Sequence, residues 1–461
     1  MLIKLNIDKI DQAIINDLIN FHSSSLLPRY RYLQGYYEGC HDILNKKVTD
    51  ESKPNNKLVN DYPGYIVDLI TGYFMGKPVT YNSKSNNDTY LQTLQDIFDY
   101  NDESDENAEL AKTCSIKGEA FELIYLDNDG NIRFTRINNE QTILVYDNEV
   151  EATPVLGIRY YKLHTLNSID MAEQTIVEVY NKNTISKYLY FNGELNLIEE
   201  KEHFFKEVPI VHYLNNEEVQ GDFEKVIPLI DAYNATQSDT QDNLDYFTNA
   251  YLMFTGATLG ENEDALNTVH QMKVNRVIEL PEGGTADFLT KNTNDTAEEN
   301  HKKRLNSDIH KFAKVPDLSD EQFSGNVTGI AIKFKYSCTE QLASMKERKF
   351  KKALQRRIEL ITNILNIKGN SYDYTDMVMS FTRNLPANIT EIADMVQKLT
   401  GVASKETLLS QLPFVTDVQS EMDKIAQEKE DSLSDDYSNL GGQSIDMHEE
   451  PSTADITDGG A

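Results

Sequence analysis

Two long, strongly polar helices that enclose a short β-rich segment constrain the fold of this chain most. From Ile227 to Leu252, apolar residues recur at helical spacing, but Gln, Asn, Asp and Thr fill most other positions. A second polar helix is predicted over 295–313, and residues 253–291 between them have the pattern of strands joined by a turn. Because helices this polar bury little apolar surface, we expect them to bridge domains or to pack against neighbouring copies.

The first 226 residues predict a mixed helical and β region, so the expected class is α+β. Helical periodicity covers residues 8–45 and 61–75, and a β pattern follows from Phe121 to about Tyr213. The stretches "LIYLDNDGNIRFTRI" and "KYLYFNGELNLIE" each place a glycine-containing turn between two alternating runs, which predicts β-hairpins. The acidic run "NDESDENAE" at 101–109 is interpreted as a solvated helix start or loop.

A loop built to bend follows the second polar helix, in "VPDLSDEQFSGNVTGIAIKFKYSC" at 315–338. Glycine permits backbone angles closed to other residues, asparagine tolerates the left-handed region, and Thr328 can cap a helix that begins near Ile330. A plain helix-to-helix turn is the alternative interpretation. The candidate functional residues of this loop are Asp317, Ser319, Asp320, Glu321, Gln322, Phe323, Ser324, Gly325, Asn326, Thr328 and Gly329.

The next helix is strongly basic, although the chain as a whole is acidic. Nine basic and two acidic residues lie between Lys333 and Arg357, whereas the whole chain carries 44 basic and 75 acidic residues and a net charge of -31. Such a helix either grips phosphates or docks on the acidic surface of its own chain. The large acidic surplus favours docking, and it disfavours nonspecific binding to nucleic acid or anionic lipid by the whole protein.

Motifs for catalysis are absent from the sequence, so we expect no enzyme activity, no cofactor and no metal. There is no G-x-x-x-x-G-K-[ST], G-x-G-x-x-G, H-E-x-x-H, C-x-x-C or G-x-S-x-G pattern. Three widely spaced cysteines suit a reducing compartment. No apolar stretch approaches the roughly 20 residues of a membrane span, and the beginning lacks a secretory signal pattern.

Four long stretches carry a family resemblance, in order along about residues 20–410. They are "RYRYLQGYYEGCHDILNKK", "KPNNKLVNDYPGYIVDLITGYFMGKPVTY", "EVPIVHYLNNEEVQGDFEKVIPLIDAYNATQSDTQDNLDYFTNAYL" and "FSGNVTGIAIKFKYSCTEQLASMKERKFKKALQRRIELI". The sequence resembles the portal proteins of tailed double-stranded-DNA phages, in the branch of long-tailed phages that infect Gram-positive hosts.

The resemblance implies a fold in named parts. These are a wing over 1–226, stem helices over 227–252 and 292–314, a β-containing clip over 253–291, a tunnel loop over 315–329, a long basic helix with a return to the wing over 330–385 and a crown over 386–433. The composition of residues 434–461, which carry several acidic residues and no Lys or Arg, predicts a disordered acidic tail. The loop residues given above would form a constriction of the DNA channel. The candidate channel-facing basic residues are Lys302, Lys303 and Lys333.

The resemblance also implies assembly and partners. About twelve copies would form a ring around double-stranded DNA, without sequence specificity, at one vertex of the capsid. The terminase motor, major capsid protein, scaffold, and head-completion and tail proteins would be partners, with no membrane involved. The protein would reside in the virion and, during assembly, in the host cytoplasm. Two other classes stay open: another head or adaptor protein of the virion, and a cytosolic nucleic-acid enzyme that uses the helix 333–357 to bind substrate.

Overall fold

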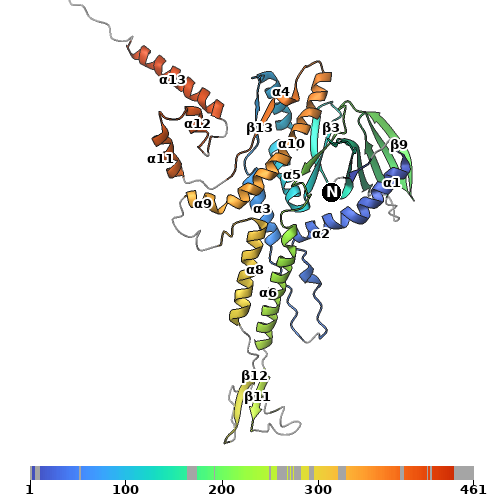
Figure 1. Cartoon of the computed structure of the whole chain (residues 1–461), viewed down its shortest axis with the longest axis vertical. Coiled ribbons are helices and arrows are strands. Elements are labelled where there is room, and N and C mark those ends of the chain that lie inside the picture. Colours follow the sequence, from blue (N-terminus) through green and yellow to red (C-terminus); the bar gives the residue numbers. More distant parts are fainter. Residues whose placement is uncertain are drawn as a thin grey trace, which may run out of the picture. The chain divides into compact units, whose positions relative to one another are not determined.

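The computed structural model divides into two compact units, Met1–Leu385 and Pro386–Ala461, which are described separately. The described residues are 3–5, 11–50, 53–163, 174–191, 193–248, 251–256, 282–289, 295–319, 329–384, 389–412, 414–415 and 418–440, with three isolated positions between 267 and 274. The chain mixes helices with sheets, as Figure 1 shows, and the predicted α+β class is confirmed.

Helices dominate the first part of the larger unit. They are α1 Gln12–Phe21, a π-helical turn His22–Leu26, α2 Leu27–Tyr37, α3 Tyr62–Met75, α4 Asp88–Tyr100 and α5 Glu103–Lys117. The starts of α1, α3 and α4 follow from side-chain caps: Asp11, Asp61 and Asn87 each accept a bond from the backbone N–H three residues on. Gly118 in the left-handed region ends α5, which is the conformation that glycine adopts without strain.

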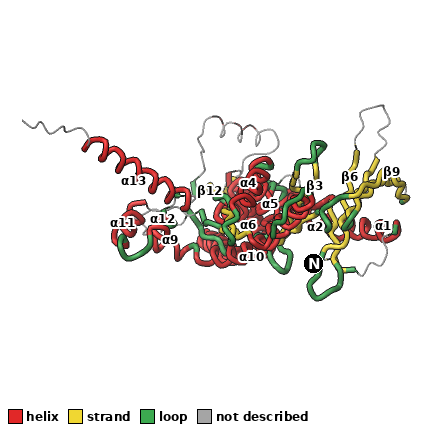
Figure 2. Tube along the Cα trace, turned by 90° about the horizontal axis from the view of Figure 1, so that it is seen from above, coloured by secondary structure: helices red, strands yellow, loops and turns green. Residues whose placement is uncertain are grey.

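A six-stranded sheet forms one layer of this unit. Its strands lie in the order β1 Ile3–Lys4, β5 Thr142–Tyr146, β6 Pro154–Leu163, β7 Gln174–Tyr180, β8 Thr184–Phe191 and β9 Glu194–Glu202. The β1–β5 pair is parallel and the other pairs are antiparallel. Helix α1 lies beside these strands in Figure 2, and it packs Ile15, Leu18 and Ile19 into the same apolar cluster as the sheet.

A second sheet contains the first predicted hairpin. It has the order β10 Ile210–Leu214, β3 Glu119–Leu126 and β4 Ile132–Ile137. The Asp127 carboxylate accepts bonds from the N–H groups of Asp129 and Asn131, and Gly130 adopts a φ of 80°. The antiparallel β8–β9 pair, turning at Gly193, is the second predicted hairpin. Both hairpins are therefore confirmed.

The two polar helices are present and lie side by side in Figure 1. They are α6 Ile227–Thr248 and α8 Asp295–Ala313, and between them β11 Tyr251–Thr255 pairs antiparallel with β12 Thr285–Leu289. The predicted end of the first helix at 252 is wrong, because the chain is already in strand β11 from Tyr251. The apolar residues keep a helical spacing into Tyr251 and Leu252, which is why the sequence placed the helix end there. In the structure these two residues pair with β12 instead. Most of 257–281 lies outside the described residues.

The basic stretch forms two helices rather than one. Helix α9 spans Gly329–Lys335 and α10 spans Ser337–Ile367, with Tyr336 between them. The Tyr336 ring stacks on Tyr73 of α3 at 5.4 Å between ring centroids. The contact of Tyr336 with α3 thus occurs where α9 ends and α10 begins. The helical pattern of the sequence did not predict this interruption. The chain then returns through β13 Met377–Ser380, which pairs with β2 Thr80–Ser83.

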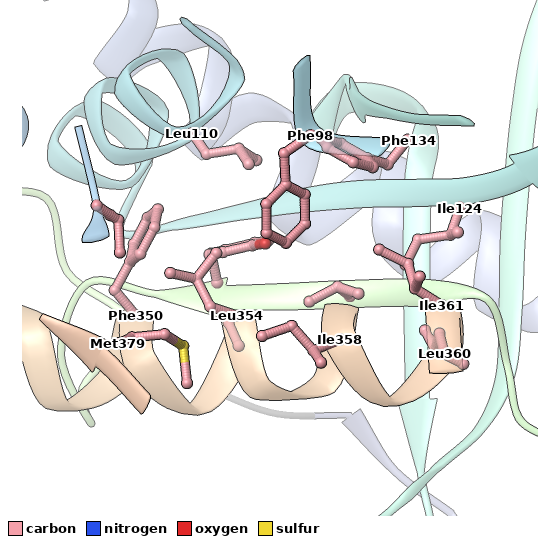
Figure 3. Close-up of a cluster of buried hydrophobic side chains, with 14 of the residues drawn as sticks. Phe98, Leu110, Ile124, Phe134, Phe350, Leu354, Ile358, Leu360, Ile361 and Met379 are labelled. Carbon is pink, nitrogen blue, oxygen red and sulfur yellow. The ribbon is translucent and has the colours of Figure 1, made fainter. Parts of the chain in front are cut away.

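Helix α10 supplies one wall of the main core. Figure 3 shows its side chains Phe350, Leu354 and Ile358 directed towards residues from α4, α5 and the sheet. This is the apolar stripe that the sequence predicts, and Phe98, Leu110, Ile124 and Phe134 belong to the same buried cluster.

An ion pair is buried inside this wall. The fully buried Arg357 donates to both carboxylate oxygens of Glu122, at 2.9 and 2.6 Å, and to Glu103 at 3.1 Å. Tyr213 and Tyr81 donate their hydroxyls to Glu122 and Glu103 respectively. Burial opposes the charge of Arg357, but Glu122 outweighs it and raises the pKa of the guanidinium well above its ordinary value.

The buried position of Glu103 corrects one expectation from the sequence. The acidic run does start helix α5, but Glu103 in its first turn is 7% exposed and not solvated. The Glu103 carboxylate lies inside because it pairs with the buried Arg357. Arg357 comes from a distant part of the chain, so the sequence around Glu103 gave no sign of this pairing.

The smaller unit is helical. Its helices are α11 Ile389–Leu399, α12 Lys405–Leu409 and α13 Val418–Leu440. Helix α13 shows that the predicted start of a disordered tail at 434 is wrong, since the helix continues to Leu440. Leu433, Tyr437 and Leu440 have the three- and four-residue spacing of a helix, which the acidic composition obscured. Residues 441–461 lie outside the described residues.

The buried ion pair predicts unequal effects at two neighbouring arginines. Arg357→Met should lower the free energy of unfolding by about 3–5 kcal/mol, because it strands two buried carboxylates. Arg356→Met is the matched control and should cost less than about 1 kcal/mol, because its ion pairs with Glu207 and Glu359 are partly exposed. Urea unfolding of both variants measures the difference. Equal losses would contradict the central role of Arg357.

Candidate functional site

The polar face of α6 is covered by an irregular segment of the same subunit. Asn234, fully buried, accepts bonds from the backbone and side-chain N–H groups of Asn60 at 2.9 Å and pairs with His41 at 2.9 Å. Ser238, also fully buried, accepts the Leu58 N–H at 2.9 Å. An irregular chain has unpaired backbone groups, so it needs polar partners. Part of the polarity of α6 is therefore used within the subunit.

Charged groups continue the same contact along α6. Lys46 lies 2.8 Å from both Asp239 and Asp242, and Asn56 donates to Asp242 and Asp245. Burial opposes ionisation of Asp242, but the bonds from Lys46 and Asn56 outweigh it and lower the pKa of this carboxyl. The segment 41–60 is thus attached to α6 along much of its length.

The base of the helical pair is apolar and packs on α3. One buried cluster joins residues at the start of α6, the end of α8 and the buried side of α3, namely Ile227, Ile230, Ile309, Ala313, Val315, Ile66, Val67 and Ile70. The two helices therefore extend from a fixed base on α3 within the larger unit.

The predicted loop begins at this base and is held by a tyrosine of α3. The Tyr65 hydroxyl donates to the Pro316 carbonyl at 2.6 Å and accepts the Leu318 N–H at 3.1 Å. Thr339 of α10 donates its hydroxyl to the Lys314 carbonyl at 2.8 Å. Lys314 itself is left-handed, with a φ of 60°, so the chain turns sharply where α8 ends.

Asp317 organises the next turn of the loop. Its carboxylate accepts bonds from the Ser319 N–H at 2.9 Å, the Ser319 hydroxyl at 2.6 Å and the Asn306 amide at 2.9 Å. Tyr62 in turn donates its hydroxyl to Asn306 at 2.7 Å. Burial opposes the charge, but the bonds from Ser319 and Asn306 outweigh it and lower the pKa of Asp317.

A buried histidine lies beside this turn. The His310 ring meets the rings of Tyr62 and Tyr65 edge to face, at 5.9 and 5.3 Å between centroids. Burial lowers the pKa of His310, although Asp317, with its carboxylate 3.7 Å from Nε2, favours the charged form. The imidazole is therefore neutral at pH 7.

The structure describes only the two ends of the predicted loop. Asp317 is partly buried, Ser319 is exposed, and Gly329 is the first residue of α9 rather than the last residue of the loop. The other candidate residues lie outside the described residues: Asp320, Glu321, Gln322, Phe323, Ser324, Gly325, Asn326 and Thr328. Sequence reasoning missed Tyr65, Tyr62 and Asn306, because nothing in the pattern of the loop points to partners on other helices.

The three candidate basic residues lie in different surroundings. Lys302 pairs with Glu299 of the same helix, and its side chain is only 12% exposed. Lys303, also on α8, and Lys333, on α9, are exposed.

The cations of α10 favour the docking interpretation. The buried Lys346 donates to Ser115 and Asp222, both at 2.6 Å, and Lys349 pairs with Glu217. Together with Arg357 and Arg356, four of the nine basic residues of the stretch contact acidic groups of the same unit. Arg348 and Lys352 are exposed.

Nothing in the described part of the chain has the form of a metal site. No group of three or more His, Cys, Asp or Glu residues there could hold an ion. Among the helices of that same part, none has both the length and the apolar character needed to cross a membrane.

Comparison with known proteins identifies the family. The family model described as "Phage portal protein, SPP1 Gp6-like" matches residues 17–435. The portal protein of Bacillus phage SPP1 is 27% identical over 95% of this chain and 89% of its own length. That of Clostridium phage phiCD119 is 24% identical over 88% and 94%. A chain from the solved neck of an empty GTA particle aligns with a TM-score of 0.45 and 12% identity, over 76% of this chain and 89% of that one.

The chain therefore belongs to the phage portal protein family, as the resemblance indicated. It is a virion protein that forms the DNA channel at a capsid vertex, serves in genome packaging and connects head to tail. Portal proteins are structural and form ring oligomers.

The buried His310 predicts a pH effect on stability. Its folded pKa lies below the ordinary value of 6.5, so the unfolded chain binds more protons below that pH, and stability falls as pH falls from about 6.5 towards the folded pKa. Thermal unfolding at pH 7.5 and 5.5 should therefore show a smaller loss in His310→Gln than in the wild type. His301→Gln, an exposed position on the same helix, is the control and should behave as the wild type. An equal loss of thermal stability in all three proteins would show that His310 does not cause this pH dependence.

Proposed function

We propose that about twelve copies of this subunit form the ring, and that α6, α8 and the segment 315–329 line its central opening. In this proposal, α6 and α8 are the stem, the insert with β11 and β12 is the clip, 315–329 is the tunnel loop, and 386–440 is the crown. The observation that carries the proposal is the polar pair of α6 and α8, which rises from an apolar base on α3 and runs directly into a loop with a fixed start.

The polarity of the helical pair supports a place beside water and DNA. The segment 41–60 covers one side of α6, and exposed residues such as Lys303 and Arg304 continue the polar character on α8. Helices that contact water in a channel on one side and neighbouring subunits on the others do not need a wide apolar stripe.

The charge of the subunit supports passage of DNA rather than its capture. About eight phosphate contacts would give strong and steeply salt-dependent binding, so a duplex held in that way would not slide. The net charge is -31, and four cations of the basic stretch contact acidic groups of their own unit. Free rings should therefore bind duplex weakly and without sequence preference.

We assign the energy for packaging to a partner. The sequence holds no phosphate-binding loop, so a terminase motor docked at the clip would drive the DNA. Head-completion and tail proteins would replace it later, while the major capsid protein and scaffold would contact the subunit during assembly in the host cytoplasm. The subunit itself would have no enzyme activity.

The loop proposal predicts a specific loss of function in a proline variant. Gly325→Pro fixes φ and removes an N–H donor, at a local cost on the order of 1–3 kcal/mol, which is too small to unfold the subunit. Gly329→Val stiffens the other end of the loop at the start of α9. Both variants should assemble with near-normal thermal stability yet fail to package DNA or to retain it in the head.

The control for this experiment is Val150→Pro, a proline at a fully exposed position of the loop between β5 and β6. Its packaging yield and the infectivity of its particles should match the wild type. Normal packaging and infectivity of both glycine variants would show that 315–329 is only a turn between helices.

A further inference from the structure

Two backbone groups at the start of the segment 315–329 bond to a single hydroxyl of α3. Tyr65 O–H donates to the Pro316 carbonyl at 2.6 Å, and the same oxygen accepts the Leu318 N–H at 3.1 Å. Backbone N–H and C=O groups in an irregular segment need hydrogen-bond partners. Proline has no backbone N–H, so the carbonyl is the only backbone group of Pro316 that can form such a bond. One side chain thus satisfies both backbone groups on the two sides of Asp317.

The tyrosine can act as a fixed support because α3 is itself anchored. Ile66, Val67 and Ile70 of this helix are fully buried in the cluster at the base of α6 and α8. The Tyr65 ring also contacts His310 edge to face. Its hydroxyl therefore has a defined position relative to the end of α8.

We infer that Tyr65 is a positioning residue that fixes the path of residues 316–318 at the start of the segment 315–329. The left-handed Lys314 turns the chain out of α8, and the Tyr65 hydroxyl then holds the next residues against α3. Asp317, held by Asn306, adds a contact to α8. That this segment is the tunnel loop rests on the proposed function, whereas the attachment itself does not.

Tyr65→Phe tests the attachment, because it keeps the ring against His310 and removes only the hydroxyl. In the assembled full-length protein, hydrogen–deuterium exchange of the peptide that carries the Leu318 N–H should become about five-fold faster, the effect of losing roughly 1 kcal/mol of hydrogen bonding. Peptides from α3 should exchange as in the wild type. Tyr37→Phe is the matched control, since that hydroxyl of α2 bonds Asp68 of α3 and has no hydrogen bond to the described residues of the segment 315–329.

The outcomes separate this inference from the proposed function. Faster exchange at Leu318 in Tyr65→Phe, with wild-type exchange there in Tyr37→Phe, supports the positioning role. Unchanged exchange in Tyr65→Phe, or equal changes in both variants, overturns it whatever the packaging result. DNA retention in heads is measured in parallel: reduced retention in Tyr65→Phe supports the tunnel-loop role as well, and normal retention with faster exchange contradicts that role alone.

Discussion

The buried ion pair of Arg357 is the constraint on which the rest of the larger unit depends. The guanidinium of Arg357 on α10 is fully buried from solvent and pairs with Glu122 on β3 and Glu103 on α5. Removing such a charge from water costs several kcal/mol, so the arrangement holds only while both carboxylates and their tyrosine partners are in place. Helix α10 is thus fixed in the unit both by this ion pair and by its apolar face.

The same contacts explain how a basic stretch fits in so acidic a chain. Lys346, Arg356 and Arg357 find acidic partners within the unit, and Lys346 and Arg357 are buried. The helix is thereby tied to β3, α5 and the loop that carries Asp222. The positive charge of these residues thereby offsets part of the acidic surplus of the subunit.

Local features were predictable from the sequence, and distant pairings were not. The turn at Asp127 and Gly130 and the apolar stripe of α10 follow from residues a few positions apart. Arg357 and Glu103 are 254 residues apart, and Tyr65 and Pro316 are 251 apart, so only the folded chain brings them together. For the same reason, the sequence indicated the loop but not the tyrosine that holds it, and it gave no sign that residues of 41–60 contact α6.

A cryo-electron microscopy structure of the purified full-length protein tests the central claim most directly, because it shows which elements face the axis of the assembly. We predict a closed ring of about twelve subunits, with α6, α8 and the segment 315–329 around the central opening and Arg357 buried in each subunit. A monomer, an open assembly, or a ring in which α6 and α8 lie on the outer surface would contradict it.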